Sequence, residues 1–351
     1  MRLPSGTFNI SYIQDMMVFR TIHHRIGLAV FLILLFLFPL FATQYWQAIL
    51  NTIAVTVIAL QGLNILAGYC GQISIGHSAF MAVGAYGSAL LMKYLDLPFW
   101  PCLLLSSVGA GVVGIIFGLS SLKVKGFYLA ISTIAAQYII TYMIKTPFPQ
   151  VTGGPISLHV PPVNLGGFVL ETETHFYYLI MIITILMTFI SKSITRSHIG
   201  RAFVAIRDND IAAEAMGINL YRYKLLAFFV GCFFAGIAGA IWAAYSKVIS
   251  PDDFTLMNSV WLMGMLIVGG LGGTLGPIFG AIFIKALNEA CVIIGPIITS
   301  LIPQIGAQFS AALVEMAFGV TIVIFLIYEP RGLAHRWEIL KESYRLWPFS
   351  Y

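Results

Sequence analysis

The stretch "GYCGQISIGHSAFMAVGAYGSALL", residues 68–91, decides the fold of this chain, because a glutamine, a histidine and serines interrupt an apolar, glycine-rich run there. Its second half is apolar enough to continue as a helix, whereas its first half mixes glycines with polar side chains. In lipid such polar groups are costly, and backbone that is not regular helix survives only inside protein or beside a wet cavity. The composition of the whole chain indicates whether the surroundings are lipid.

The chain has 351 residues, of which 59% are hydrophobic and only 9% are charged. Soluble domains carry about 25% charged residues, so water alone cannot solvate this surface. Runs such as "IGLAVFLILLFLFPLFA" (26–42) approach the roughly 20 apolar residues that cross a bilayer core. The composition therefore predicts an all-α polytopic membrane protein surrounded by lipid. Its net charge of +5 is too small and too scattered to indicate a nucleic-acid partner.

Apolar blocks predict about ten transmembrane spans. The first of them follows three arginines and lacks a clear small-residue cleavage site, so we expect a retained span and not a removed signal peptide. The chain then divides into an N-terminal segment (1–25), a membrane domain (26–328) and a C-terminal tail (329–351). The expected spans are 26–42, 46–66, 71–92, 98–122, 126–144, 175–191, 225–245, 260–275, 276–294 and 308–328.

The positive charges are distributed unevenly between the segments that join these spans. With the N-terminus inside, fifteen of the 19 Lys and Arg residues fall in 1–25, 123–125, 192–224 and 329–351. Lysine and arginine accumulate on the cytoplasmic side because they resist translocation. The asymmetry predicts that both termini are cytoplasmic.

The polar part of the opening stretch must lie partly at membrane depth. A helix over residues 79–92 would be about 21 Å long at about 1.5 Å per residue, whereas the hydrocarbon core is about 30 Å thick. We expect a helix that begins near Ser74, which places Ser74, His77 and Ser78 on one face. Gly71 and Gly76 would permit close backbone approach.

A second interruption, "VGGLGGTLGPIFGAIF" (268–283), breaks a span late in the chain. Glycine-interrupted hydrophobic segments, one in each half of a chain, are the best sequence indication of a transporter's pathway. Tight helix packing through small residues is the alternative for single glycines. The candidate pathway or gate residues are Gly71, Gln72, Ser74, Gly76, His77, Ser78, Gly269, Gly270, Gly272, Gly273 and Pro277.

Charges inside the predicted spans are few. Lys285 and Glu289 are four residues apart on one helix face, so they could neutralise one another. Glu315 either faces inward with a partner or lies near the membrane interface. The cysteines lie in apolar surroundings without metal-ligand spacing, so they are interpreted as small buried hydrophobes and no metal site is predicted.

The most polar stretch of the chain, 192–224, contains "RDNDIAAEAMGINLYRYK" (207–224). Asp208 or Asn209 is a suitable N-cap for a short helix, and Gly217 is placed to end it. Such a helix between two spans is either a docking element for a cytoplasmic partner or an interfacial connector. The residues alone leave both open.

Six stretches, in this order, resemble the permease family of branched-chain amino acid ABC importers, in particular its second, longer permease. The resemblance covers roughly residues 45–333. It rests on "AGYCGQISIGHSAFMAVGAY", "GFYLAISTIAAQYI", "VTGG", "RAFVAIRDNDIAAEAMGINLYRYKLLAFFVGCFFAGIAGAI", "VGGLGGTLGPIFGA" and "YEPRGL".

The resemblance implies an importer in a bacterial inner membrane, made of two related permease subunits, two cytoplasmic ATPases and an extracytoplasmic binding protein. This chain would bind no cofactor, because ATP and Mg are used by the ATPases. The loop 192–224 resembles the one through which such permeases engage their ATPases, which favours a coupling helix there. The coupling residues implied are Arg207, Asp208, Asp210, Glu214, Ala215 and Gly217.

Other functions stay open on the sequence. A urea or short-amide ABC permease would have the same architecture, although "GQISIGHSAF" resembles the amino-acid branch more. After "VTGG" the segment "PISLHVPPVNL" departs from the polar segment common in the family, which bears on substrate preference. An ion-coupled secondary transporter would need more ionisable groups at mid-membrane and no docking helix. The absence of H-E-x-x-H spacing favours a transport subunit over an enzyme.

Overall fold

The computed structural model describes residues 22–122, 126–164, 170, 172–301 and 308–346. Almost all of the described chain is helical, which confirms the predicted all-α membrane fold. The predicted N-terminal segment lies almost entirely outside the described residues. The two strands, β1 (Leu158–His159) and β2 (Val248–Ile249), pair antiparallel.

The long helices follow the apolar runs of the sequence, and some of them, such as those that end at Lys145, Gly269 and Tyr328, end within two residues of a glycine or a proline. In chain order the helices are α2 (Ile22–Phe41), α3 (Gln44–Leu63), the π-helical η1 (Asn64–Tyr69), α4 (His77–Leu95), α5 (Phe99–Gly118), the 3-10 turn η2 (Leu119–Leu122), α6 (Phe127–Lys145), α7 (Pro149–Thr152), α8 (Glu173–Arg196), α9 (His198–Asp208), α10 (Asp210–Ala215), α11 (Leu220–Ser246), the 3-10 turn η3 (Pro251–Phe254), α12 (Leu256–Gly269), α13 (Gly276–Leu301), α14 (Gln308–Tyr328) and α15 (Leu333–Leu346).

Six of the described helices are long and apolar enough to cross a membrane, or seven if the bent pair Ala312–Tyr328 and Leu333–Tyr344 forms one span. The predicted number of about ten is not confirmed. α4, α12 and the apolar part Ile26–Phe41 of α2 are not among the six. Two of these, α4 and α12, adjoin the glycine interruptions, so the breaks in the backbone explain part of the difference.

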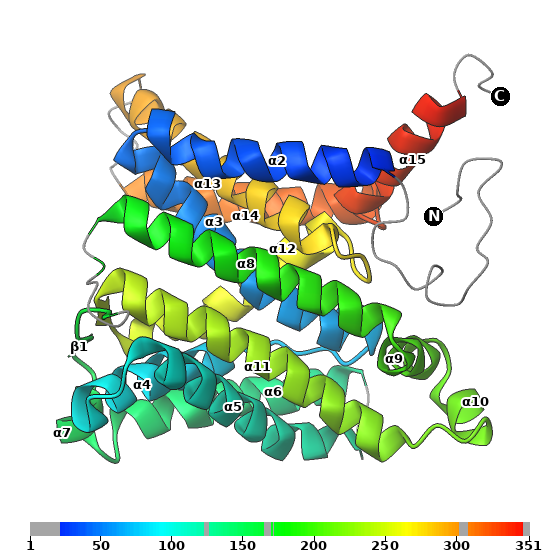
Figure 1. Ribbon diagram of the computed structural model, residues 1–351, viewed down its shortest axis with the longest axis horizontal. Helices are drawn as coiled ribbons and strands as arrows, with labels where there is room; N and C mark the ends of the chain where they lie inside the picture. Colours follow the sequence, from blue (N-terminus) through cyan, green and yellow to red (C-terminus); the bar gives the residue numbers. More distant parts are fainter. Residues whose placement is uncertain (1–21, 123–125, 165–169, 171, 302–307, 347–351) are drawn as a thin grey trace.

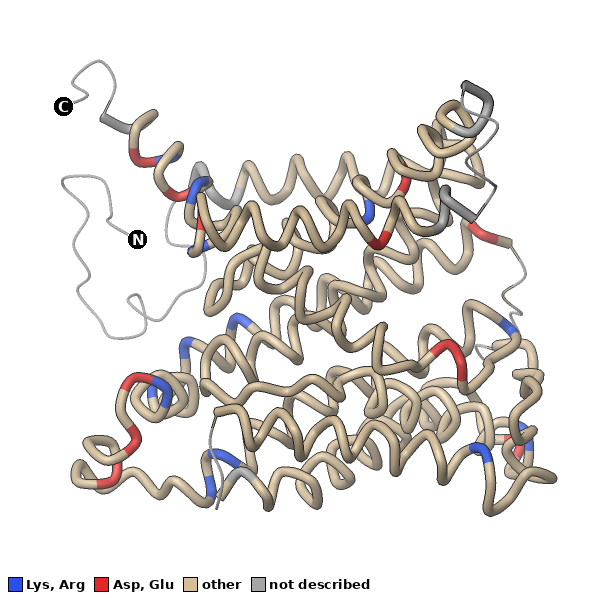
Figure 2. The backbone as a smooth tube through the Cα atoms, turned by 180° about the vertical axis from the view of Figure 1, so that it is seen from behind, with Lys and Arg blue, Asp and Glu red and all other residues tan. Residues whose placement is uncertain are grey.

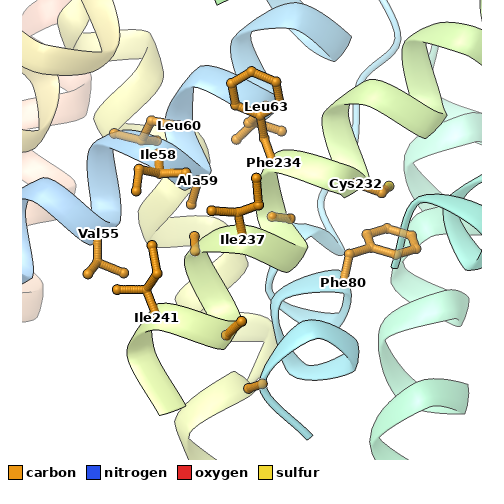
Figure 3. Close-up of a cluster of buried hydrophobic side chains, with 14 of the residues drawn as sticks. Val55, Ile58, Ala59, Leu60, Leu63, Phe80, Cys232, Phe234, Ile237 and Ile241 are labelled. Atoms are coloured by element: carbon orange, nitrogen blue, oxygen red, sulfur yellow. The ribbon is translucent and has the colours of Figure 1, made fainter. Parts of the chain in front are cut away.

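The core is built around α11, which packs against α5, α4 and α3. Figure 3 shows side chains of α3 and α11 meeting there, among them Leu63 and Ile237, with Phe80 of α4 nearby. Small residues let these helices approach closely, as is common in membrane bundles. A Cβ added at Gly84 of α4 would lie 2.2 Å from the Gly236 carbonyl oxygen of α11.

The short helices and the strands gather at the two ends of the bundle. α9, α10 and α15 lie at one end, and α7 and β1 lie at the other (Figure 1). Most charged residues also lie toward these ends, with few between them (Figure 2). The C-terminal tail contains α15, which lies on the side of α9 and α10. Which membrane face each end meets stays a prediction from the charge asymmetry.

The helix expected from about Ser74 begins only at His77, so that boundary was wrong. The backbone before it is satisfied by another helix and not by a helical turn of its own. The Ile75 amide donates to Thr133 Oγ1 of α6 at 3.0 Å, and a Cβ on Gly76 would lie 2.1 Å from the Thr133 carbonyl oxygen. Contact with α6 therefore holds this segment in a non-helical form.

Replacement of Gly239 by alanine tests the close packing of α11 on α4. A Cβ there would lie 1.9 Å from the Met81 carbonyl oxygen, so one helix must move. Overpacking of this kind costs about 1–3 kcal/mol, and we expect Gly239→Ala to lower the Tm of the purified protein in detergent.

Gly109→Ala in α5 is the matched control, because no heavy atom lies within 4 Å of a Cβ built there. Alanine has the higher helix propensity, so this variant should keep or raise the Tm. Equal Tm values for the two variants would contradict the close approach.

Candidate translocation and coupling site

The first interruption runs from the end of α3 to the start of α4. The helix widens to a π-helix over Asn64–Tyr69 and then gives way to extended backbone, in which Gly71 has φ +69°. The Cys70 amide donates to the Ile65 carbonyl at 3.1 Å, and the Gln72 amide donates to the Leu66 carbonyl at 3.0 Å. π-helical turns often mark functional sites, and this one leads directly into the predicted pathway residues.

The second interruption joins α12 to α13 through residues 270–275. Gly270 and Gly272 have φ values of +107° and +79°, which residues with a side chain rarely adopt. A Cβ at Gly269 would lie 2.0 Å from the Gly276 carbonyl oxygen, so the two helices meet through backbone alone. Glycine is required here for both conformation and space.

The two interruptions lie against each other. Asn64 Nδ2 donates to the Gly273 carbonyl at 2.9 Å, and the Gly272 amide donates to Asn64 Oδ1 at 2.9 Å. Gln61 Nε2 donates to the Thr274 carbonyl at 3.0 Å. One buried asparagine therefore satisfies both a donor and an acceptor of the opposite loop. Gln61 and Asn64 were not among the predicted pathway residues, although two amide side chains in an apolar span indicate a polar contact.

The start of α4 is held by a buried polar cluster. The Ser78 amide donates to Ser259 Oγ at 2.9 Å, and the Ala79 amide donates to Gln137 Oε1 at 3.0 Å. Ser259 Oγ also donates to Gln137 Oε1, at 3.0 Å. Helices α4, α6 and α12 thus share one network, which satisfies helix-start amides that have no partner within α4.

The predicted polar residues of the first interruption are all buried, with Ser74 and His77 at 0% exposure, Ser78 at 1% and Gln72 at 8%. His77 Nε2 lies 3.1 Å from the Ala59 carbonyl oxygen. Within the described part of the chain, Ser74 Oγ, His77 Nδ1 and Ser78 Oγ have no hydrogen-bond partner. Such unpaired buried atoms are uncommon and call for an explanation.

The segment predicted to couple to a partner, 192–224, contains two short helices, α9 and α10, between the end of α8 and the start of α11. Asn209 is the N-cap of α10, because its side chain accepts from the Ala212 amide at 3.1 Å. Gly217 ends α10 with φ +85°, while the Ile218 amide bonds back to the Ala213 carbonyl at 3.0 Å. This arrangement is a Schellman motif. The short capped helix is confirmed, with Asn209 and not Asp208 as its cap.

One face of α10 is exposed and the other is attached to the bundle. Glu214, Ala215 and Met216 are exposed, and the Ile211 side chain is 75% exposed. On the attached side, Asp210 forms an ion pair of 3.7 Å with Lys224 of α11, which is 4% exposed. α10 therefore presents an apolar and acidic surface while staying fixed to α11.

Arg207, near the end of α9, reaches both interruptions. Its Nη1 donates to the Gly68 carbonyl at 2.9 Å, and its Nε donates to Asp208 Oδ1 at 3.0 Å. A Cβ at Gly272 would lie 3.1 Å from Arg207 Nη1, and one at Gly71 would lie 3.0 Å from Arg207 Cγ. The guanidinium thus packs between the two glycine-rich segments and links them to α9.

A cavity of about 470 Å³ lies between α3, α4, α11, η3, α12 and α13. Ser78 is the one predicted pathway residue among those that line it. Lys285 also lines it, but within the described residues no ion pair joins it to Glu289, which accepts a 2.6 Å hydrogen bond from Tyr45. The possible mutual neutralisation of Lys285 and Glu289 is therefore not seen as a direct contact. Glu315, on α14, is exposed.

The four cysteines are free and buried, in agreement with their interpretation as small hydrophobes. Among the described residues, no group of three or more His, Cys, Asp or Glu side chains could hold a metal ion.

Helices long and apolar enough to cross a membrane, together with two glycine-rich interruptions in contact, are typical of polytopic transport permeases. Residues 45–327 match the family described as "Branched-chain amino acid transport system / permease component". The chain belongs to this family, and it is a multi-pass membrane transport subunit.

Individual relatives fit this assignment. The chain is 27% identical over 337 residues to the high-affinity branched-chain amino acid transport system permease protein LivM of Escherichia coli K12, which covers 89% of this chain and 75% of LivM. It is 24% identical over 325 residues to LivH of the same strain, covering 87% of this chain and 98% of LivH. A ribose import permease, RbsC of Haemophilus influenzae, is 23% identical to the chain over 252 residues, which cover 69% of this chain and 75% of RbsC. No solved structure matches the chain.

Replacement of Asn64 by leucine tests the contact between the interruptions. The change leaves the Gly272 amide and the Gly273 carbonyl without their partner, and each unsatisfied buried group costs about 1–3 kcal/mol. We expect a clear loss of thermal stability in detergent.

Thr56→Val on α3, which directly precedes η1, is the control, because among the described residues the Thr56 hydroxyl donates only to the Thr52 carbonyl of its own helix, at 2.8 Å. If Asn64→Leu has the same Tm as Thr56→Val and the unchanged protein, the Asn64 contact does not hold the two interruptions together.

Proposed function

We propose that this chain is a membrane-spanning subunit of an ATP-driven importer for branched-chain amino acids in a bacterial inner membrane. Its partners would be a second, related permease, two cytoplasmic ATPases that use ATP and Mg, and an extracytoplasmic binding protein. The family and the relatives LivM and LivH support this substrate class and the pairing of two permeases. Loop 192–224 would be the site of ATPase coupling.

The observation that carries this proposal is the Arg207 contact. α10 offers an exposed surface to a cytoplasmic partner, and Arg207, two residues before the cap of α10, contacts the backbone of the first interruption and packs against the second. A displacement of α9 and α10 by closing ATPases would therefore move both interruptions. Movement of the helices that adjoin them would switch access between the two membrane faces, as in other transporters built on broken helices.

The residues of the candidate pathway would have two different tasks in this scheme. The glycines, together with Pro277 at the start of α13, allow the backbones to lie in contact and to bend. Gln72, Ser74, His77 and Ser78 supply the polar groups beside the path. Their burial and three unpaired atoms are consistent with groups that find partners in another state or with a bound solute.

Replacement of Arg207 by glutamine tests the coupling route. The variant loses the charged donor to the Gly68 carbonyl, and a charge-assisted hydrogen bond is worth about 1.5–3 kcal/mol. In proteoliposomes that contain the complete importer, we expect ATP-driven leucine uptake to fall about tenfold or more. ATP hydrolysis and recovery of the ATPases should persist.

Arg201→Gln is the matched control on the same helix, since Arg201 is exposed and its side chain, among the described residues, donates only to the Arg196 carbonyl, at 3.4 Å. Uptake by this variant should equal that of the unchanged importer. Normal uptake by Arg207→Gln would remove the argument for coupling through this side chain.

Replacement of Gly217 tests the docking helix separately. No heavy atom lies within 4 Å of a Cβ built at Gly217, but its φ of +85° disfavours a β-branched side chain. Gly217→Val should therefore distort the end of α10 and reduce the amount of ATPase that co-purifies with the permease. Gly217→Asn should retain more ATPase, because asparagine tolerates this conformation. Full recovery of the ATPase with Gly217→Val would place docking elsewhere.

A further inference from the structure

The 470 Å³ cavity contains polar groups that the fold itself does not satisfy. Ser78, at the start of α4, is 1% exposed and its Oγ has no described partner. Lys285 of α13 lines the same cavity, and no described acidic group lies within ion-pair distance of it. A cation within a membrane span is rare and usually functional. Both groups indicate that something binds in the cavity.

The cavity also carries negative charge on η3. Asp252 is paired with Lys145 of α6 at 2.8 Å, so its charge is offset. Asp253 accepts the Ser250 amide at 2.7 Å through one carboxylate oxygen, and no described cation forms an ion pair with it. One positive and one negative side chain therefore line the same space without neutralising each other directly.

The rest of the lining is mostly apolar. Val55 of α3, Leu262 and Met265 of α12 and Ile284 of α13 contribute aliphatic surface, and Trp242 of α11 adds an aromatic ring. Small-molecule sites commonly have volumes of about 300–1,000 Å³ and apolar walls with a few polar groups that fix orientation. The cavity has this size and character.

We propose that this cavity is a binding site for a zwitterionic α-amino acid with an aliphatic side chain, within the permease itself. The ligand carboxylate would accept from the Lys285 ammonium and the Ser78 hydroxyl, and the ligand ammonium would donate to Asp253. Asn288, nearly one turn after Lys285, adds an amide to the lining. The ligand side chain would lie against Val55, Leu262 and Ile284.

This inference rests on the proposed function and deepens it. A site of this kind selects the solute a second time, after the binding protein has released it. It also explains why Ser78 keeps an unpaired hydroxyl at the start of a broken helix, next to the network of Ser259 and Gln137.

The test is equilibrium binding of radiolabelled leucine to the assembled importer in nanodiscs, without its binding protein. We expect saturable binding, with competition at least tenfold weaker by 4-methylpentanoate, which lacks the ammonium, and by leucinol, which lacks the carboxylate. Lys285→Met and Ser78→Ala should each weaken leucine binding, Lys285→Met by about tenfold or more.

Two variants control for general damage. Lys93→Met removes a lysine at the far end of α4, and Ser88→Ala removes a buried hydroxyl of α4 that donates to its own helix. Neither residue lines the cavity, so both variants should bind leucine normally. Basal ATP hydrolysis, measured on every preparation, shows that the complex is assembled.

The inference is overturned if leucine binding is absent, or is unchanged in Lys285→Met and Ser78→Ala, while the importer with its binding protein still accumulates leucine. In that case the proposed function stands. If the same preparation accumulates urea but not leucine, the proposed substrate class fails as well. Uptake assays with both solutes therefore separate the two failures.

Discussion

Every polar backbone group that leaves regular helix at membrane depth must find a partner inside the protein, and this constraint shapes the whole molecule. Two stretches, before α4 and between α12 and α13, break regular helix. Their amides and carbonyls are satisfied by side chains of other helices, such as Asn64 and Thr133. The broken segments are thus tied by hydrogen bonds to α3, α6 and to each other.

The same constraint explains how a signal from outside the membrane could reach the pathway. Arg207 contributes a charged donor to the Gly68 carbonyl, a backbone group of the first interruption. Glycines at positions 71 and 272 leave room for its side chain. The hydrogen bond that satisfies the Gly68 carbonyl also joins the first interruption to α9, and α10 follows directly in the chain. Structure and proposed coupling therefore depend on one side chain.

Part of this architecture could be predicted from the sequence, because glycine and capping residues act locally. The interruptions near residues 71 and 270, the N-cap near Asn209 and the end of α10 at Gly217 all follow from local backbone preferences. The start of α4 at His77 could not be predicted, because it is set by Thr133 and Gln137 on another helix.

The partners of Asn64 and Arg207 could not be predicted from the sequence either. Both residues contact backbone more than 130 positions away in the chain, and neither spacing nor hydropathy reports such contacts. The predicted number of spans is not confirmed for a related reason. Hydropathy counts apolar runs, whereas broken helices such as α12 are too short to cross a membrane alone.

The central claim is that ATPase movement reaches the broken segments through Arg207, and thiol labelling of Gly273→Cys tests it most directly. Gly273 has open space for a side chain, and the four native cysteines are buried, so background labelling should be low. In the assembled importer, the account predicts a labelling rate that changes on ATP binding, with the change lost in Arg207→Gln and kept in Arg201→Gln. A change on ATP binding that survives in Arg207→Gln would contradict it.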